Sequence, residues 1–253
     1  MDLEGSMSFD DNVLNYDKYR TTYVKELFDD LFAYSNCNEN SHVIEIGCGT
    51  GQATSWVLDR GCTLKAIEIG KNLCDFTKNK FKNYPKLEVI NMPFEEYTMQ
   101  ENSVDMVFSA SAFHWIPEDI GYPKVYNALK KGGCFAIIGC PVEIADVNAE
   151  LKAEVEGIER EYLPQNTGTY QDEYNIMQQK FELYGFHDII HNQYSAFREL
   201  TAEEYVGLMM SVSRISKLSG PSRDLLFEKI RNVINKHRSI QIHDKMDLYM
   251  GRK

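Results

Sequence analysis

Residues 42–54 read HVIEIGCGTGQAT, and this stretch decides the fold. An apolar run carries an acid, Glu45, and glycines follow two residues apart at Gly47, Gly49 and Gly51. Glycine adopts left-handed backbone and lets a ligand approach the main chain, so glycines after a buried strand predict a ligand-binding turn. A dinucleotide-binding turn has the spacing GxGxxG, whereas position 52 here is glutamine, which favours a different cofactor.

The chain around this turn alternates between strand and helix patterns joined by short connections. Nearly continuous apolar strands that alternate with helices are typical of a parallel sheet covered on both faces. Apolar runs predict strands at residues 43–47, 63–70, 87–91, 104–111 and 134–140, and helical periodicity predicts helices at 23–34, 52–60, 71–84 and 122–131.

The pattern changes in the second half of the chain. Residues 142–184 look largely helical with a break at 163–169, a strand follows from 187 to 197, and residues 201–238 return to helix. The C-terminal stretch alternates apolar and polar residues as a half-buried antiparallel strand does, and Asp244 is its one exception.

Composition excludes several classes of partner. The chain has 253 residues and a formal net charge of −11, so neither nucleic acid nor an anionic membrane surface is an expected partner. No apolar run approaches the roughly 18 residues of a membrane helix, and the first residues lack the features of a signal peptide. Six cysteines without CxxC pairs predict reduced thiols in a cytoplasmic protein. No metal site is predicted, and nothing indicates an oligomeric state.

An acid at the end of the second predicted strand supports a nucleoside ligand. Glu68 lies 21 residues after Gly47 (68 − 47), where nucleoside-binding α/β folds place a carboxylate that accepts hydrogen bonds from ribose hydroxyls. Both NAD enzymes and methyltransferases share this requirement, so Glu68 does not choose between them.

The glycine spacing, in contrast, distinguishes methyltransferases from NAD enzymes. ExGxGxG at the end of the first strand resembles motif I of class I S-adenosylmethionine-dependent methyltransferases. The segment YDKYR at residues 16–20 resembles the opening of the trans-aconitate-methyltransferase-like small-molecule group. The resemblance is specific over residues 42–140 and weak after 141. It implies a Rossmann-like α/β fold with a seven-stranded, mostly parallel sheet, an antiparallel last strand and a helical cap.

The resemblance also implies how one domain, residues 1–253, is divided. Residues 1–36 would form helices over the cofactor, 37–140 the cofactor-binding core, and 141–170 with 198–238 a cap over the substrate pocket. The cofactor would be S-adenosyl-L-methionine, with S-adenosyl-L-homocysteine as product.

The resemblance assigns cofactor contacts residue by residue. The glycine loop would touch the methionine and ribose parts, and the segment NMPFEEY at residues 91–97 would hold the adenine. Pro93 departs from the family pattern because it has no N–H to offer the ring. Arg20 could pair with the cofactor carboxylate. The full implied set is Tyr16, Tyr19, Arg20, Glu45, Gly47, Gly49, Gly51, Gln52, Glu68, Ile69, Met92, Phe94, Glu95, Ser109 and Ala110.

The acceptor side is less readable. His114 and Trp115 follow the fourth strand, at the end where open α/β sheets bind ligands, so they are predicted to line the substrate pocket. His114 is also the candidate general base, needed for an alcohol or phenol acceptor but not for a carboxylate. Residues 198–238 carry eight Lys or Arg against five acids, and Arg214 among them is the candidate for binding an anionic metabolite.

The resulting hypothesis is methyl transfer from S-adenosylmethionine to a small molecule. An NAD(P)-dependent oxidoreductase is the alternative enzyme, although the GxGxxG spacing is absent. A protein that binds S-adenosylmethionine without methylating anything is the alternative from another class, because methyl transfer requires few obligatory side chains.

Overall fold

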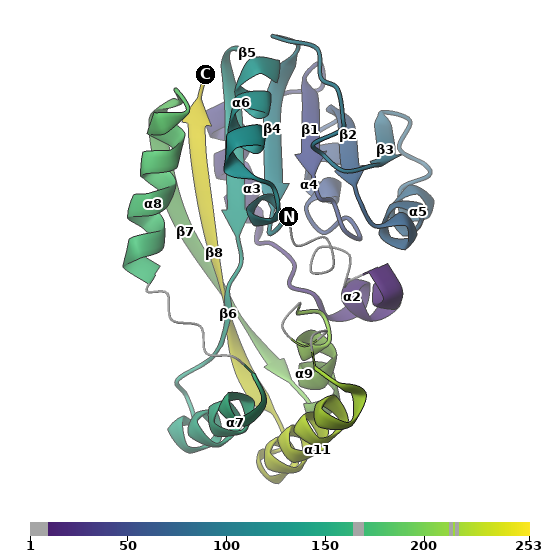
Figure 1. Ribbon diagram of the computed structural model, residues 1–253, viewed down its shortest axis with the longest axis vertical. Coiled ribbons are helices and arrows are strands. Elements are labelled where there is room, and N and C mark those ends of the chain that lie inside the picture. The colour runs from purple at the N-terminus through teal and green to yellow at the C-terminus, as the bar shows by residue number, and fades with distance from the viewer. Residues whose placement is uncertain (1–9, 164–169, 213–214, 216–217) are drawn as a thin grey trace.

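The computed structural model describes residues 10–163, 170–212, 215 and 218–253 (Figure 1). Its elements are η1 (Asp10–Asn12), α2 (Val13–Tyr19), α3 (Lys25–Ser35), β1 (His42–Ile46), α4 (Thr54–Leu58), β2 (Thr63–Glu68), α5 (Lys71–Lys80), β3 (Leu87–Asn91), β4 (Val104–Ala110), η2 (Phe113–Trp115), α6 (Glu118–Ala128), β5 (Leu129–Gly139), β6 (Val142–Ile144), α7 (Ala149–Tyr162), α8 (Tyr170–Leu183), β7 (His187–Leu200), α9 (Ala202–Met209), α11 (Gly220–His237) and β8 (Ile240–Arg252).

One sheet organises the chain. Its strand order is β3-β2-β1-β4-β5-β8-β6, with β7 paired to β8. Strands β1 to β5 are parallel, and β8 runs antiparallel to β5, β6 and β7. The predicted Rossmann-like α/β fold with a mostly parallel sheet and an antiparallel last strand is therefore confirmed.

The strand count differs from the predicted seven because β5 and β6 share one edge of β8. Residues 134–139 pair with the upper part of β8, and Val142–Ile144 pair with Asp244–Ile242 below. The break between them falls at Cys140 and Pro141, where proline has no N–H for the ladder. The short strand β6 lies inside a segment that was predicted to be largely helical.

The predicted helix at 122–131 is displaced. Helix α6 begins at Glu118, directly after Pro117 and with two acids in its first turn, and it ends at Ala128. Gly132 and Gly133 therefore do not close a helix. They lie inside β5, where the pairing with β4 shifts register and Gly132 has φ +77°. A glycine pair marks a strand irregularity as readily as a helix end.

Other predicted boundaries hold with smaller changes. The helix predicted at 52–60 is the shorter α4, the helix predicted at 71–84 ends at Lys80, and the strand after Gly185 extends to Leu200. The predicted break at 163–169 falls almost entirely outside the described residues.

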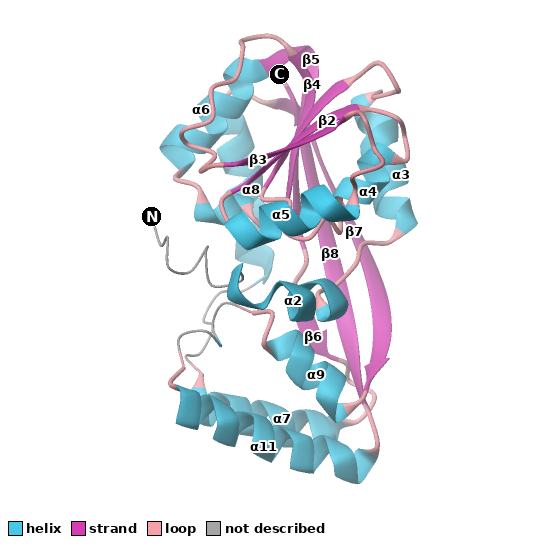
Figure 2. Cartoon of the chain, turned by 90° about the vertical axis from the view of Figure 1, so that its right-hand side faces the viewer, coloured by secondary structure: helices cyan, strands magenta, loops and turns pink. Residues whose placement is uncertain are grey.

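Helices cover both faces of the sheet (Figure 2). Leu27, Phe28 and Leu31 of α3 are fully buried against one face, with Val57 of α4 beside them. The other face is covered by α6 and α8, with Tyr122 and Phe181 among the largest buried side chains. This two-sided burial explains why the strands read as continuous apolar runs.

A second apolar cluster lies below the sheet. Strands β7 and β8 continue past the parallel strands as an antiparallel ribbon, in which β8 also pairs with the short β6, and helices α7, α9 and α11 pack around its lower end (Figure 1). We call α7, α9 and α11 the cap. The helix starts are satisfied locally: Thr201 and Glu204 form a capping box on α9, and Ser219 caps α11.

No helix among the described residues is long and apolar enough to cross a bilayer. In the same part of the chain, no three His, Cys, Asp or Glu side chains gather as a metal site would require.

Candidate functional site

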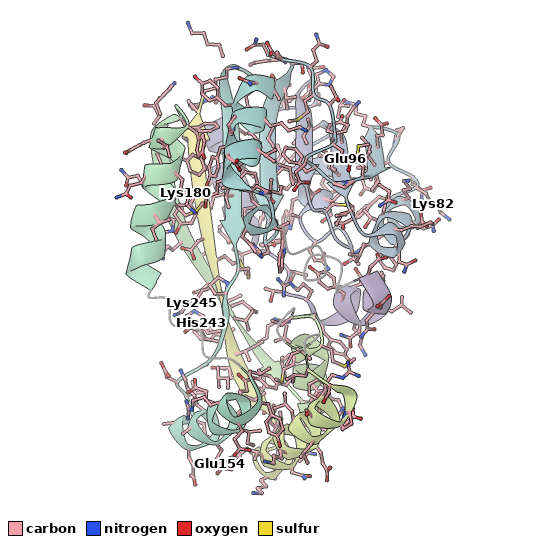
Figure 3. All side chains as sticks on the ribbon, viewed as in Figure 1. Lys82, Glu96, Glu154, Lys180, His243 and Lys245 are labelled. Carbon is pink, nitrogen blue, oxygen red and sulfur yellow. The ribbon has the colours of Figure 1, made fainter. Side chains whose placement is uncertain are left out.

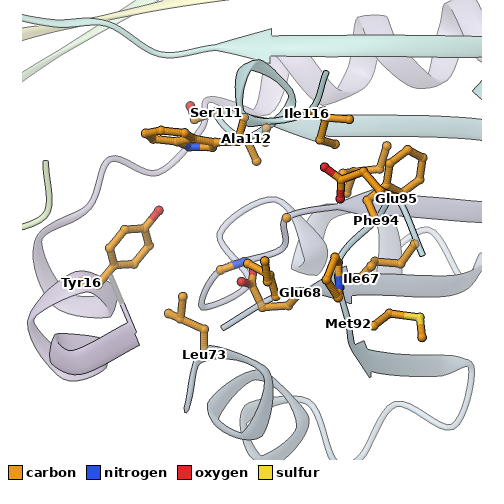
Figure 4. A pocket seen from close by; sticks show the side chains of 17 residues that line it. Tyr16, Ile67, Glu68, Leu73, Met92, Phe94, Glu95, Ser111, Ala112 and Ile116 are labelled. Carbon is orange, nitrogen blue, oxygen red and sulfur yellow. The ribbon is translucent and has the colours of Figure 1, made fainter. Parts of the chain in front are cut away.

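A pocket opens at the carboxyl ends of β1, β2 and β4, the edge where open α/β sheets bind ligands. Figure 4 shows its side chains converging from the strand ends, α2 and α5. The lining is Tyr16, Ile46, Gly47, Gly49, Ile67, Glu68, Ile69, Leu73, Met92, Pro93, Phe94, Glu95, Ala110, Ser111, Ala112, Trp115 and Ile116.

The glycine loop forms the floor of this pocket with its backbone. Gly47, Gly49 and Gly51 have φ of +70°, +55° and +87°, which is left-handed backbone that favours glycine. A Cβ on Gly47 would lie 2.4 Å from the Cβ of Ala112, and one on Gly49 would contact the ring of Tyr16. The loop therefore needs glycine both for conformation and for close approach.

Glu68 stands at the centre of the pocket (Figure 4). Its Oε2 accepts a hydrogen bond from the N–H of Gly49 at 2.8 Å, and its Oε1 accepts one from Gly70 at 2.9 Å. Burial raises the pKa of this carboxyl, although the two backbone hydrogen bonds oppose the shift. A carboxylate offers about four lone-pair sites, so two remain for hydroxyl groups of a ligand.

An apolar slot lies beside Glu68, at the end of β3. Met92 and Phe94 line it, and Phe94 is buried. Lys124 of α6 supports the loop, because its Nζ donates to the carbonyl of Glu95 at 2.6 Å and lies 5.4 Å from the Phe94 ring centroid. Apolar side chains next to a carboxylate suit a nucleoside base and its ribose.

The segment after β4 forms the opposite wall. Ser111 has φ +57°, a left-handed conformation that costs a non-glycine residue about 1–2 kcal/mol. Its N–H is held by the carbonyl of Ile138 at 2.8 Å, and its hydroxyl lies 3.5 Å from the Tyr23 hydroxyl. Trp115 lines the pocket, and its ring centroid lies 4.8 Å from that of His114.

His114 lies outside the pocket lining and is exposed next to it. Partial desolvation by the surrounding protein lowers the pKa of His114 below the usual 6.5, and the charge of Arg20 adds to the shift. The imidazole is therefore neutral at pH 7 and has a nitrogen able to accept a proton.

The N-terminal segment closes the pocket from below, where α2 lies between the core and α9 (Figure 2). Tyr16 points into the pocket, and the guanidinium carbon of Arg20 lies 5.6 Å from its ring centroid. Arg20 donates from Nη1 to the carbonyl of Ser211 at 3.3 Å, so it faces the cap side. Tyr19 faces the cap fully, because its ring packs on Gly207 of α9.

Several predicted cofactor residues lie outside the lining and support it instead. Buried Glu45 accepts a hydrogen bond from Thr54 Oγ1 at 2.6 Å, and burial raises its pKa to about 8. Ser109 is buried and donates to the carbonyl of Ile46. Gln52 donates to Thr50. Gly51 faces the ring of Phe81, and Tyr19 and Arg20 lie as described above.

Six residues of the lining were not singled out from the sequence, and Pro93 appeared only as a departure from the family pattern. The six are either neighbours of predicted residues along the same strands and loops or come from α5, and the small residues SASA at 109–112 were the available signal for two of them. The six are Ile46, Ile67, Leu73, Ser111, Ala112 and Ile116. Arg214, the predicted anion-binding residue, lies outside the described residues.

Comparison with known proteins identifies a domain over this region. A family model described as "Methyltransferase domain" matches residues 44–137, which carry β1 to β5 and most of the pocket. An uncharacterized methyltransferase of Schizosaccharomyces pombe is 22% identical over 241 residues, covering 95% of this chain and 92% of the relative.

Other relatives match only the core. A malonyl-[acyl-carrier protein] O-methyltransferase of Acetivibrio thermocellus is 29% identical over 136 residues, covering 51% of this chain and 47% of that enzyme. An uncharacterized methyltransferase of Mycobacterium tuberculosis is 28% identical over 133 residues, and the chain again spans about half of its length (52%).

Solved structures share the fold. A candidate type II methyltransferase from Anaeromyxobacter dehalogenans superposes with a TM-score of 0.67 at 16% identity, covering 92% of this chain and 98% of that one. A Haemonchus contortus phosphoethanolamine N-methyltransferase, solved with phosphomonomethylethanolamine and S-adenosylhomocysteine, has a TM-score of 0.57 at 16% identity, covering 100% of this chain and 61% of that one.

Proposed function

We propose that this chain, a class I S-adenosylmethionine-dependent methyltransferase, methylates a small molecule held between the pocket and the cap. The observation that carries this proposal is the position of Trp115 and His114. They lie at the carboxyl end of β4, beside the cofactor pocket. The pocket is also close to the cap, because the N-terminal segment that forms one of its walls contacts α9.

S-adenosylmethionine is the cofactor, and we assign its contacts to the pocket lining. Glu68 would accept hydrogen bonds from the ribose, and Met92 with Phe94 would enclose the adenine. The backbone at Gly47 and Gly49 would approach the ribose and methionine parts, where a Cβ would fill the space. Arg20 would pair with the cofactor carboxylate, since within the described residues its hydrogen bond goes to a carbonyl.

The bound cofactor supplies an activated methyl group on a positively charged sulfur. The protein's own contribution is placement and exclusion of water. Tyr16 and Trp115 line the pocket and would help to exclude water from a bound cofactor, and neutral His114 could take a proton from a hydroxyl acceptor.

We further propose that the chain belongs to the trans-aconitate-methyltransferase-like group and that its acceptor is a carboxylate or another anionic metabolite. Arg20 brings positive charge to the side of the pocket that faces the cap, within a chain of net charge −11. Residues 141–170 and 198–238 would then shape the acceptor pocket, with His114, Trp115 and Arg214 as its predicted contacts.

Isothermal titration calorimetry and a turnover assay test this proposal. S-adenosylhomocysteine should bind with a measurable heat and NAD should not. Transfer of labelled methyl from S-adenosylmethionine should then occur with at least one member of a panel of small carboxylates, phosphates, alcohols and amines. Binding without transfer to any of them would favour the non-catalytic alternative, and NAD binding would favour the oxidoreductase.

A further inference from the structure

An ion pair between the core and the cap lies outside the lining of the cofactor pocket, with its carboxylate buried and its guanidinium partly exposed. Asp244 of β8 is 1% exposed, although it lies on the apolar face of its strand. Arg198 of β7 binds it with two nitrogens: Nε donates to Oδ2 at 2.5 Å and Nη2 donates to Oδ1 at 2.9 Å. Figure 3 labels His243 and Lys245, the neighbours of Asp244, at the level of β8 between the core and the cap.

The pair also binds the N-terminal segment. The hydroxyl of Thr21 donates to Asp244 Oδ1 at 2.8 Å and accepts from Arg198 Nη2 at 3.0 Å. Arg198 Nη1 donates to the carbonyl of Tyr19 at 3.3 Å. Thr21 is 4% exposed, so this junction is closed to solvent on the side of the segment.

The two residues that the pair holds flank Arg20. Tyr19 and Thr21 precede and follow it, and Tyr16 lies one helical turn earlier on α2. Asn15 of the same helix donates to the carbonyl of Gly207, while Arg20 donates to that of Ser211. Contacts from β7, β8 and α9 therefore converge on one short stretch that reaches into the cofactor pocket.

We propose that Arg198 and Asp244 are positioning residues that hold residues 19–21 through Thr21, so that Tyr16 faces the pocket and Arg20 is placed for its proposed pairing with the cofactor carboxylate. The link to the cofactor rests on the proposed contacts of Tyr16 and Arg20. An ion pair with a buried carboxylate is weak evidence for stability, because the cost of desolvating the charge offsets the attraction between the partners. Its additional hydrogen bonds to Thr21 and Tyr19 give it a role that an apolar pair of similar size could not fill.

Hydrogen exchange of the ligand-free protein tests directly whether these contacts hold residues 19–21 in place. Thr21→Val keeps the ion pair and the side-chain shape but removes the bridging hydroxyl. Amides of residues 13–24 should exchange at least about tenfold faster in Thr21→Val and in Arg198→Met, which is about 1.4 kcal/mol of lost local stability. Arg198→Lys, which keeps the charge without the forked geometry, should fall between Arg198→Met and the wild type.

Two variants serve as matched controls. Arg231→Met removes an arginine whose Nε donates to Glu203 at 2.8 Å on the cap surface, and Thr98→Val changes an exposed loop threonine. Neither should change exchange in residues 13–24. If Arg198→Met does not fold, Thr21→Val decides the question alone.

Calorimetry extends the test to the cofactor. The dissociation constant of S-adenosylhomocysteine should rise about tenfold in Thr21→Val, while that of 5′-methylthioadenosine, which lacks the amino-acid part, should rise less than about threefold. Unchanged exchange in residues 13–24 of folded Thr21→Val would overturn the positioning role. Failure of the wild type to bind S-adenosylhomocysteine would instead remove the proposed cofactor contacts, and the exchange result would stand independently.

Discussion

The cofactor pocket differs in construction from the junction above the cap, by which we mean Thr21, Arg198 and Asp244. The pocket uses backbone at strand ends and residues close in sequence, such as Gly49 and Glu68, which are 19 positions apart. The junction uses side chains: Thr21 lies 177 positions from Arg198 and 223 from Asp244. The pocket can therefore be predicted from short stretches of the sequence. The junction cannot, because its residues come together only when the chain folds.

The largest effect on the cofactor pocket is expected from a substitution at Gly47. An alanine there would combine left-handed strain with a Cβ 2.4 Å from that of Ala112. We expect Gly47→Ala to lower the free energy of unfolding by about 2–5 kcal/mol, the sum of a left-handed non-glycine residue and an overpacked core contact. Urea denaturation followed by circular dichroism measures this, and S-adenosylhomocysteine binding should be lost in the same variant.

Gly132 is the matched control for Gly47. Its φ is +77°, but a Cβ there would meet nothing within 4 Å. Gly132→Ala should therefore cost only the left-handed strain of about 1–2 kcal/mol and leave cofactor binding unchanged. Equal losses in the two variants would show that the close approach of Gly47 to Ala112 contributes nothing.

Glu68 tests the one side chain at the centre of the pocket. Glu68→Ala should weaken S-adenosylhomocysteine binding by about 1.5–3 kcal/mol, or roughly 10- to 160-fold, because hydrogen bonds to a charged group are lost. Calorimetry measures the change. Glu88→Ala, which removes an exposed carboxylate paired with Lys65, is the control and should have no effect. Unchanged affinity in Glu68→Ala would mean that Glu68 is not the ribose acid.

The local character of the pocket explains what the sequence could predict. The glycine spacing, Glu68 and the Met92–Phe94 loop were all readable, because each depends on a strand end and its next few residues. Ser111 was not singled out, since its left-handed backbone is imposed by hydrogen bonding to Ile138 on the neighbouring strand. Glycines 132 and 133 were misjudged as a helix end because their role depends on the register between β4 and β5.

The junction was hidden for a different reason. Asp244 appeared only as an exception to an alternating strand, and Arg198 only as one of many charges. Their relation comes from the pairing of β7 with β8, where Arg198 lies opposite Ile242, two residue pairs from Asp244, which lies opposite Ala196. No local pattern records that Thr21 will reach them. The same holds for Gly207, whose packing against Tyr19 joins segments far apart in the chain.

Gly207 of α9 tests whether contacts from the cap affect cofactor binding. A Cβ on this helical glycine would lie 2.4 Å from the Tyr19 ring, so Gly207→Ala should push α2 away from α9. We expect the dissociation constant of S-adenosylhomocysteine to rise about three- to tenfold, or roughly 1 kcal/mol. Gly157→Ala in α7 is the control: the nearest atom is 3.8 Å away, and alanine there should stabilise the helix by about 0.5–1 kcal/mol. Equal affinity for S-adenosylhomocysteine in both variants would show that the packing of α2 on α9 does not affect the cofactor site.

The smallest effect is expected at His114, between the two regions. The pKa of His114 in the folded protein lies below the unfolded value of 6.5, so the unfolded chain binds more protons below pH 6.5. The free energy of unfolding therefore decreases as the pH is lowered through this range. His114→Asn should remove that part of the acid sensitivity, seen as a smaller difference between urea midpoints at pH 5 and pH 7.5. Since a carboxylate acceptor carries no proton to remove, kcat at pH 7.5 should fall by less than about tenfold. A loss of roughly 10²- to 10⁴-fold would instead identify His114 as a general base and the acceptor as a hydroxyl group.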